Sequence, residues 1–358
     1  MKSLNFLRAV HDRRSRAAAE TDGVGCGFLS TAGPRCAPPG PAAGTHRQLG
    51  PVVNPPSTLG MSHHARIIKW GGHANHPGSG SPRRAAGHPR GTIVCTAFIS
   101  LEPSSAVPVL LLSVRDEYVG RPWLPPDRHW PSRPAVVGGL DLVAGGTWFA
   151  VDPESERQDG PVAACLLNGF GPEVDPRARL SRGDLPLTAV IDHGLDHLEP
   201  ERYDPFHLLV ARPTGARLLS WSGSGLTDRA LPPGLSVVLN DGLEGRAENR
   251  TASQRVRLMM AARAAHFRDR LQAVARPEPA DGSAEDAWGD WLPLACGDGL
   301  DLDDPAALIQ RRDFGDGRIW GSTSISLLAL GPAGARYDFR PVPGDGAWRR
   351  IDLGPYDH

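Results

Sequence analysis

The chain has 358 residues, of which 40% are hydrophobic, and its formal net charge is -1, so it is long enough for one large domain or two small ones. The near-neutral total hides two unlike parts: residues 1–94 hold 12 Lys and Arg against 3 Asp and Glu, whereas the remainder holds 27 against 37. The acidic body argues against a nucleic-acid partner, and no apolar run is long enough to span a membrane.

Residues 1–93 are expected to form a disordered or untranslated leader. The first 94 residues contain 10 Pro and 14 Gly, and they cannot bury enough apolar area to offset their chain entropy. The opening is too short and too quickly polar for a secretory signal. An organellar transit peptide and a propeptide removed by self-cleavage remain alternatives.

The codon usage implied by the composition supports an untranslated leader. Lys2 and Lys69 are the only lysines, and all other basic residues are Arg, as a GC-rich gene would encode. Such genes often start at GTG, which reads as Val internally and as Met at initiation. Val94 directly precedes Cys95, so initiation there would give Met-Cys-Thr. We therefore expect the working domain to comprise residues 94–358.

The first elements of this domain form a predicted hairpin. Residues 93–99 alternate as a strand rich in Ile, Val and Thr, and a Pro- and Ser-containing turn leads to a second apolar run at residues 107–114. In an antiparallel hairpin about this turn, the numbers of two residues that lie opposite each other add up to about 209. Cys95 then lies opposite residues 114 and 115. A thiol, the Arg115 guanidinium and two carboxylates, those of Asp116 and Glu117, are expected to meet at one end of the hairpin.

Further along the chain, periodicity and turn signals predict more strands and a few helices. Two of the predicted strands end in an asparagine, Asn168 and Asn240. Two further hairpins are expected, one from residues 147–151 and 162–167 and one from residues 206–211 and 217–221. A buried strand is expected at residues 235–239, and residues 319–330 should close the fold as one or two strands. Three helices are expected, at residues 187–198, 252–275 and 304–309.

Five short segments resemble those of a known family. Cys95-Thr96 opens a strand, and residues 113–117 read Ser-Val-Arg-Asp-Glu. Residues 141–148 read Asp-Leu-Val-Ala-Gly-Gly-Thr-Trp, residues 181–185 read Ser-Arg-Gly-Asp-Leu, and residues 203–209 form the last segment. Over about residues 94–330 the sequence resembles the NRDE-motif family, also called transport and Golgi organisation protein 2. The resemblance implies an α+β fold, a four-layer αββα sandwich of the N-terminal-nucleophile (Ntn) hydrolase type found in choloylglycine hydrolases.

The sequence also departs from this family pattern. Val114 stands where the motif usually has Asn, and Thr323 stands where many members carry Arg. Above all, Cys95 is internal in the chain as written. An untranslated or removed leader accounts for this last departure.

The resemblance assigns chemical roles to five residues. An N-terminal Cys95 would be the nucleophile, because an α-amine with a pKa near ~8 can accept the proton of a thiol with a pKa near ~8.5. Arg115 would favour the thiolate, and Asp116 would hold the amine. Asn168 and Asn240 would donate hydrogen bonds to the developing oxyanion.

Structural readings of the same residues stay open. Cys95 could be a small buried hydrophobe, the Arg-Asp-Glu run a structural ion-pair cluster, and the asparagines ordinary turn residues. His193 and His197 are four residues apart, but they lack the Glu of a His-Glu-x-x-His site and fit a solvated helix end better. No metal or cofactor is expected.

The sequence as a whole predicts a cysteine amidohydrolase that acts on a small C–N bond. Its partner would be a small-molecule amide, and an odd set of three cysteines in the body indicates a reduced, cytoplasmic protein. The alternative, which rests on the resemblance alone, is a non-catalytic protein on the same fold that handles or traffics haem or lipid. The missing motif Asn at Val114 favours this alternative.

Overall fold

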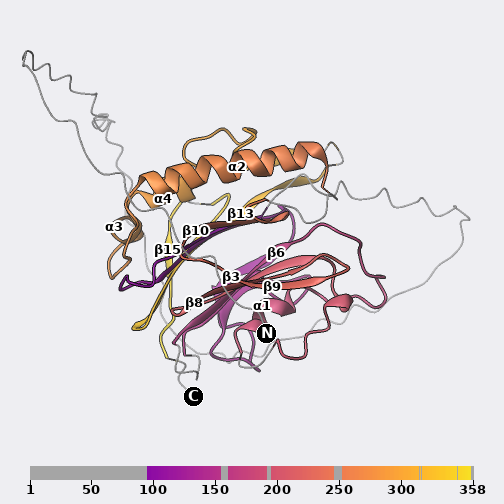
Figure 1. The fold of residues 1–358 in the computed structure, drawn as a ribbon, viewed down its shortest axis with the longest axis horizontal. Helices are drawn as coiled ribbons and strands as arrows, with labels where there is room; N and C mark the ends of the chain where they lie inside the picture. Colours follow the sequence, from indigo (N-terminus) through magenta and orange to yellow (C-terminus); the bar gives the residue numbers. More distant parts are fainter. Residues whose placement is uncertain are drawn as a thin grey trace, which may run out of the picture. The chain divides into compact units, whose positions relative to one another are not determined.

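The computed structural model describes residues 95–154, 160–191, 195–245, 252–313, 315, 317–344 and 346–355. These residues form two antiparallel sheets, seen nearly edge-on in Figure 1. The first sheet has the order β11-β10-β1-β2-β13-β14-β15, with β12 also paired to β13. Its strands are β1 (Thr96–Leu101), β2 (Val109–Tyr118), β10 (Gly234–Leu239), β11 (Gly242–Leu243), β12 (Arg311–Asp313), β13 (Ile319–Gly331), β14 (Gly334–Pro341) and β15 (Arg349–Ile351).

The second sheet is a meander in which each strand pairs with the next one along the chain. Its strands are β3 (Trp123–Asp127), β4 (Val137–Asp141), β5 (Phe149–Asp152), β6 (Val162–Asn168), β7 (Phe206–Arg212), β8 (Gly215–Trp221) and β9 (Leu226–Ala230). The longest connection, residues 169–205 between β6 and β7, carries the helical segments of this half of the molecule.

The two sheets bury a core between their facing surfaces. Successive side chains of a strand point to opposite faces, so Ala97 and Ile99 of β1 share one face. Both are fully buried and pack in one cluster with Phe149 and Leu209 of the second sheet and with Tyr337 of the first. This face of β1 leads directly to Cys95, the residue before the strand.

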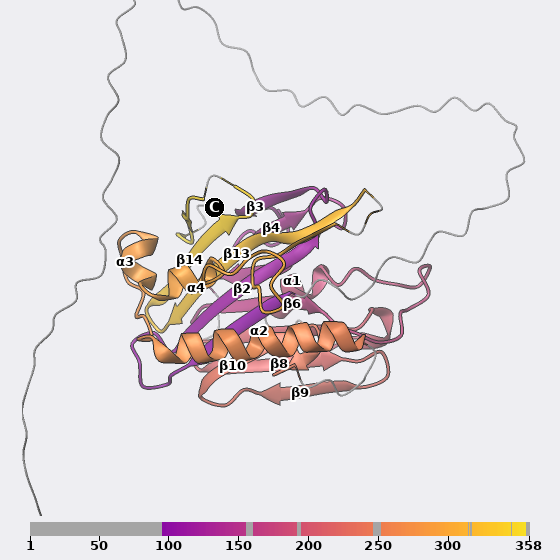
Figure 2. The same ribbon diagram turned by 90° about the horizontal axis from the view of Figure 1, so that it is seen from above.

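Helices cover the outer faces of the sheets. The long helix α2 (Gln254–Ala273) crosses the outer face of the first sheet, as Figure 2 shows from above, together with α3 (Ala284–Trp288) and α4 (Trp291–Ala295). Phe267 of α2 packs against Phe98 of β1 with their ring centroids 5.9 Å apart. The outer face of the second sheet packs against the short α1 (Asp184–Ala189), which is followed by the 3-10 helix η1 (Pro200–Arg202). None of the helices in the described part of the chain is long and apolar enough to cross a membrane.

Most of the predicted strands and the long helix are confirmed. In the first hairpin Thr96 pairs with Val114, so facing residue numbers sum to 210, one more than expected. The other two hairpins form as β5 with β6 and β7 with β8. The closing stretch is one strand, β13. Overall, the described chain is mostly β-sheet with few helices, a more strand-rich composition than the expected α+β class suggests.

Two predicted helices are wrong in extent or type. The helix expected at residues 187–198 is α1, which ends at Ala189. The helix expected at residues 304–309 does not form: the Asp304 carboxylate accepts a hydrogen bond from the amide of Ala306 at 2.7 Å and closes a turn. An Asp side chain can satisfy a nearby amide in a turn as well as at a helix start, and here the turn is stabilised.

Candidate active site at Cys95

A cavity of about 500 Å³ opens beside the start of β1. Four of the five residues that the sequence singled out line this cavity: Cys95, Arg115, Asp116 and Asn168. Hairpin pairing brings the first three together, and Asn168 reaches the cavity from the end of β6 in the second sheet. Cys95, Arg115 and Glu117 therefore meet at the end of the hairpin, together with Asn168. The predicted meeting of the Asp116 carboxylate with the thiol is not found, because this carboxylate points to the opposite side of the sheet, where it bonds to Gln310 and Ser322.

The strand β2 divides its side chains between two environments at this point. Side chains alternate along a strand, so Arg115 and Asp116 point to opposite faces. Leu111 belongs to the core between the sheets, which places Arg115 on that face with Cys95. Val114 packs in the cluster beneath α2 and is 1% exposed. We call the first side the cavity face and the second the helix face of the first sheet.

The Cys95 thiol interacts with the main chain of β2. Its Sγ lies 3.4 Å from both the amide nitrogen and the carbonyl oxygen of Asp116. Burial raises the pKa of the thiol to about 12; the nearby Asp116 charge adds to the rise, and Arg115 opposes it. With a peptide bond before Cys95, the thiol is therefore neutral at physiological pH. A thiol in this setting needs a base before it can act as a nucleophile.

Arg115 is fixed on the cavity face by several partners. Its guanidinium donates hydrogen bonds to Thr323 Oγ1 at 3.0 Å and to Asp141 Oδ2 at 3.2 Å. The guanidinium carbon also lies 4.4 Å from the ring centroid of Trp148, in a cation–π arrangement. Because of these contacts, the positive charge beside Cys95 is held in one place.

The Asp116 carboxylate is buried on the helix face. It accepts hydrogen bonds from Gln310 Nε2 and Ser322 Oγ, both at 2.6 Å, and lies 3.7 Å from Arg263 of α2. Arg263 in turn donates to the Thr96 hydroxyl at 3.0 Å. Burial raises the pKa of Asp116 to about 6, against the lowering effect of Arg263. The main chain of Asp116 thus contacts the thiol while its side chain anchors β1 and β2 to the helix layer.

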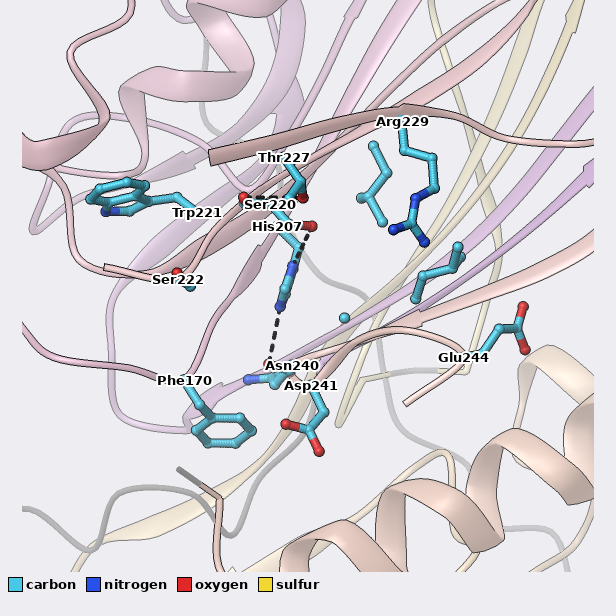
Figure 3. Close-up of a pocket in the computed structure, with 13 residues that line it drawn as sticks. Phe170, His207, Ser220, Trp221, Ser222, Thr227, Arg229, Asn240, Asp241 and Glu244 are labelled. Atoms are coloured by element: carbon cyan, nitrogen blue, oxygen red, sulfur yellow. Dashed lines mark hydrogen bonds between the residues drawn. The ribbon is translucent and has the colours of Figure 1, made fainter. Parts of the chain in front are cut away.

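The two asparagines occupy different pockets. Asn168 lines the Cys95 cavity, whereas the side chain of Asn240 lines a second pocket of about 260 Å³, drawn in Figure 3. The pairing of Thr96 with Leu239 nevertheless makes Asn240 the cross-strand neighbour of Cys95 in the first sheet. The Asn240 Oδ1 atom is buried and has no hydrogen-bond partner within the described residues.

The second pocket is organised by a neutral histidine. Figure 3 shows His207 between Ser220 and Asn240. Its Nε2–H donates to the carbonyl oxygen of Asn240 at 3.2 Å, and its Nδ1 lies 2.8 Å from the Ser220 hydroxyl. Burial lowers the pKa of His207 to about 4, so the ring is uncharged at physiological pH. The aromatic rings of Phe170 and Trp221 also line this pocket.

Several residues of the Cys95 cavity were not identified from the sequence as site residues. Asp141 and Trp148, which fix Arg115, and Arg182, which lines the cavity, all belong to segments that carried only the family resemblance. The sequence signal that could have identified them is their position in segments that resemble the family. Within the described residues no group of three or more His, Cys, Asp and Glu could hold a metal ion. His193 lies outside the described residues, so the pair with His197 is described only in part.

Comparison with known proteins identifies the family of the chain. A family model described as Transport and Golgi organisation 2 matches residues 94–275, half of the chain. No curated protein matches the chain. The matched range contains β1, β2 and every residue that the sequence proposed for the site.

Proposed function

Because the chain belongs to the Transport and Golgi organisation 2 family, we propose that its mature form is a cysteine amidohydrolase of the Ntn type that begins at Cys95 and hydrolyses a small C–N bond. The observation that carries this proposal is the position of Cys95 beside the fixed Arg115 guanidinium in a cavity of about 500 Å³. A cavity of this size suits a small molecule.

The arrangement of layers supports the Ntn part of the proposal. The helices α2, α3 and α4 lie on one side of the paired sheets and α1 lies on the other, as an αββα sandwich requires. The nucleophile position also fits, since Cys95 directly precedes the first strand of the first sheet. We further propose a cytoplasmic location, because the described cysteines are all free.

A free amine at Cys95 supplies the base that the buried thiol lacks. In the proposed mechanism the amine takes the thiol proton, and the thiolate attacks the amide carbonyl carbon to form a C–S bond. The oxyanion receives a hydrogen bond from Asn168. The ammonium group then returns the proton to the departing amine as the C–N bond breaks. Water attacks the thioester in a second cycle of the same proton transfers, which releases the acid and restores the thiol.

The first test concerns the natural N-terminus. We expect the protein made in its own cell to begin at Cys95, since Val94 precedes a Cys-Thr pair and the family match begins at residue 94. Mass spectrometry of the intact native protein should give the mass of residues 95–358. Abundant native peptides from residues 2–90 would contradict this start.

The second test concerns the nucleophile. A thiol-directed acyl probe should label Cys95 ahead of Cys165 and Cys296 in a protein that begins at Cys95, and labelling should fall in Arg115→Ala. Cys95→Ala should abolish labelling at this site, whereas Cys95→Ser keeps the terminal amine with a weaker nucleophile. Equal labelling of all three thiols, unaffected by Arg115, would favour the non-catalytic alternative, a haem or lipid carrier.

The position of Val114 bears on that alternative. The side chain at position 114 packs in the cluster beneath α2 and is 1% exposed, and the residue also borders the Cys95 cavity. Val in place of the motif Asn therefore leaves an apolar residue at this edge of the cavity, which fits a carrier as well as a hydrolase.

A further inference from the structure

We propose that Arg182 binds a carboxylate of the molecule that enters the Cys95 cavity, so that the substrate is an amide that also carries a carboxylate. That the substrate is an amide rests on the proposed function. That it carries a carboxylate rests on the charged residues of the cavity.

Arg182 differs from the other arginines of the cavity by having no acidic partner. Arg115 and Arg121 both contact Asp141, at 3.2 and 2.5 Å. Arg179 pairs with Asp204 at 2.8 Å. Among the described residues Arg182 forms no ion pair, and its hydrogen bond goes from Nη1 to the carbonyl oxygen of Pro205 at 2.8 Å.

The carboxylates of the cavity are already engaged by other groups. Asp141 accepts hydrogen bonds from the amides of Val143 and Ala144 in addition to its two arginines. Asp204 accepts from the amide of Val174 as well as from Arg179. Glu117 lies 3.7 Å from Arg115 and accepts from the amide of Tyr118 at 2.8 Å. The fourth acidic residue of the lining, Asp116, directs its carboxylate to the helix face and to Arg263.

The lining of the cavity therefore carries an excess positive charge at Arg182. Its arginines are Arg115, Arg121, Arg179 and Arg182, and the carboxylates that face the cavity are those of Glu117, Asp141 and Asp204. Burial lowers the pKa of Arg182, and the nearby carboxylates of Asp204 and Glu173 offset this effect only in part. The positive charge of Arg182 therefore lacks full compensation by acidic residues. An added anion would remove this penalty.

The chemistry of the guanidinium indicates which anion fits. Arginine has five N–H donors in a planar fork, and a carboxylate accepts two of them in parallel. The hydrogen bond to Pro205 uses one donor and leaves a fork for a ligand. Cys95 and Arg182 line the same cavity, so a carboxylate held at Arg182 would lie in the cavity that contains the proposed nucleophile.

The main chain holds Arg182 in a defined position. The amide of Thr147 donates to the carbonyl oxygen of Gly183 at 2.8 Å, and the amide of Leu185 donates to that of Arg182 at 3.0 Å. A Cβ atom at Gly146 would lie 2.4 Å from the carbonyl carbon of Gly183, so only glycine permits this close approach. The Gly-Gly-Thr-Trp and Ser-Arg-Gly motifs thus meet each other, and the contact positions Arg182 in advance of binding.

A binding experiment on the Cys95→Ala form of the protein that begins at residue 95 tests the carboxylate directly. The probes are N-acetylglycine and its neutral counterpart N-acetylglycinamide, titrated by calorimetry. We expect N-acetylglycine to bind at least about tenfold more tightly, as one charge-assisted bidentate contact allows. Arg182→Gln should abolish the difference, and Arg182→Lys should keep part of it, because lysine retains the charge without the fork.

Arg202→Gln is the matched control for the loss of one positive charge. The Arg202 side chain is 49% exposed, pairs with Glu199 and does not line the cavity. This variant should keep the preference for N-acetylglycine. Unfolding midpoints of all variants check that each is folded. Equal binding of the two probes, or binding of neither, overturns the carboxylate proposal.

A second experiment separates failure of this proposal from failure of the proposed function. In the protein with an unchanged Cys95, the thiolate displaces iodide from iodoacetate or from iodoacetamide, and an S–C bond forms in both cases. We expect Arg182→Gln to lower the ratio of the two alkylation rates about tenfold. Fast alkylation at an unchanged ratio overturns the role of Arg182 and leaves Cys95 as nucleophile. Slow alkylation by both reagents contradicts the nucleophile, while the calorimetric comparison still decides on Arg182.

Discussion

The cavity face and the helix face of the first sheet use the same two strands in opposite ways. On the cavity face, Cys95 and Arg115 lie against about 500 Å³ of open space. On the helix face, Asp116 and Thr96 are buried under α2 and bound by Arg263. Adjacent residues of β2 therefore belong to a site on one side and to its support on the other.

This difference teaches how an Arg-Asp-Glu motif can serve two purposes. A buried charge is costly unless it is paired and hydrogen-bonded, so the helix face is filled with partners for the Asp116 carboxylate. On the cavity face, Arg115 is held by Thr323, Asp141 and Trp148 beside open space, where a ligand has access to it. We expect substitutions on the helix face to change stability most and those on the cavity face to change reactivity most.

The largest effect is expected from breaking the buried ion pair of the helix face. Arg263→Met should lower the free energy of unfolding by about 3–5 kcal/mol, because it leaves the Asp116 carboxylate without its counter-charge. Urea denaturation measures this loss. Arg255→Met, an exposed arginine of the same helix, should stay within about 0.5 kcal/mol of the unchanged protein. Equal losses in the two variants would contradict the distinction between the faces.

The pH dependence of stability tests Asp116 in a second way. Its pKa is raised from 3.8 to about 6 in the folded protein, so the folded state binds the proton more tightly than the unfolded state does. This contribution to stability is present below the unfolded pKa and is lost as the pH rises through about 6. In the unchanged protein this titration makes the free energy of unfolding larger at pH 4 than at pH 7 by on the order of 2 kcal/mol, and Asp116→Asn should remove this difference. Identical pH profiles for the two proteins would show that Asp116 does not titrate in this range.

Thr323 tests how the cavity face holds its guanidinium. Thr323→Val removes the hydroxyl that accepts from Arg115 and donates to the Arg115 carbonyl oxygen. We expect a loss of about 1–2 kcal/mol of stability and slower labelling of Cys95. Thr323→Ser keeps the hydroxyl and should restore the labelling rate. A Val variant that labels at the normal rate would mean that Asp141 and Trp148 alone position Arg115.

The smallest effect on stability is expected at Cys95 itself. Cys165 is 1% exposed between the sheets, and Cys165→Ala should cost about 1 kcal/mol by leaving a void. Cys95 borders the cavity, so Cys95→Ala should cost less than this. Thermal unfolding compares the two variants. A larger loss at Cys95 than at Cys165 would support a structural role for Cys95.

The part of the site that was predictable from sequence is the part made by local pairing. Hairpin geometry places Cys95 beside Arg115, because the two residues are separated by one turn and their register follows from residue numbers. The partners of Asp116 were not predictable in this way. Gln310 and Ser322 lie 194 and 206 residues further along the chain. Ser322 meets Asp116 because β13 pairs with β2, and Gln310 is held there by its hydrogen bonds with Ser322.

The same limit applies to the fold. Each hairpin was visible from alternation and turn residues, whereas the order of strands in the first sheet depends on long connections. The placement of β10 beside β1 joins residues far apart in the chain and sets Asn240 next to Cys95. The helix expected at residues 304–309 failed because tertiary context and an Asp-capped turn prevailed over local propensity.

The central claim is that a free amine at Cys95 turns a half-buried, neutral thiol into a nucleophile. The most direct measurement is the alkylation rate of Cys95 by iodoacetamide as a function of pH, in the protein beginning at Cys95 and in the full chain, with Cys165 as the internal reference. The account predicts that at neutral pH the shortened protein reacts at least about tenfold faster than the full chain, with an apparent pKa near ~8. In the full chain Cys95 should react as slowly as Cys165, whose thiol pKa burial also raises to about 12. Equal rates and equal pH profiles in the two forms would contradict the claim.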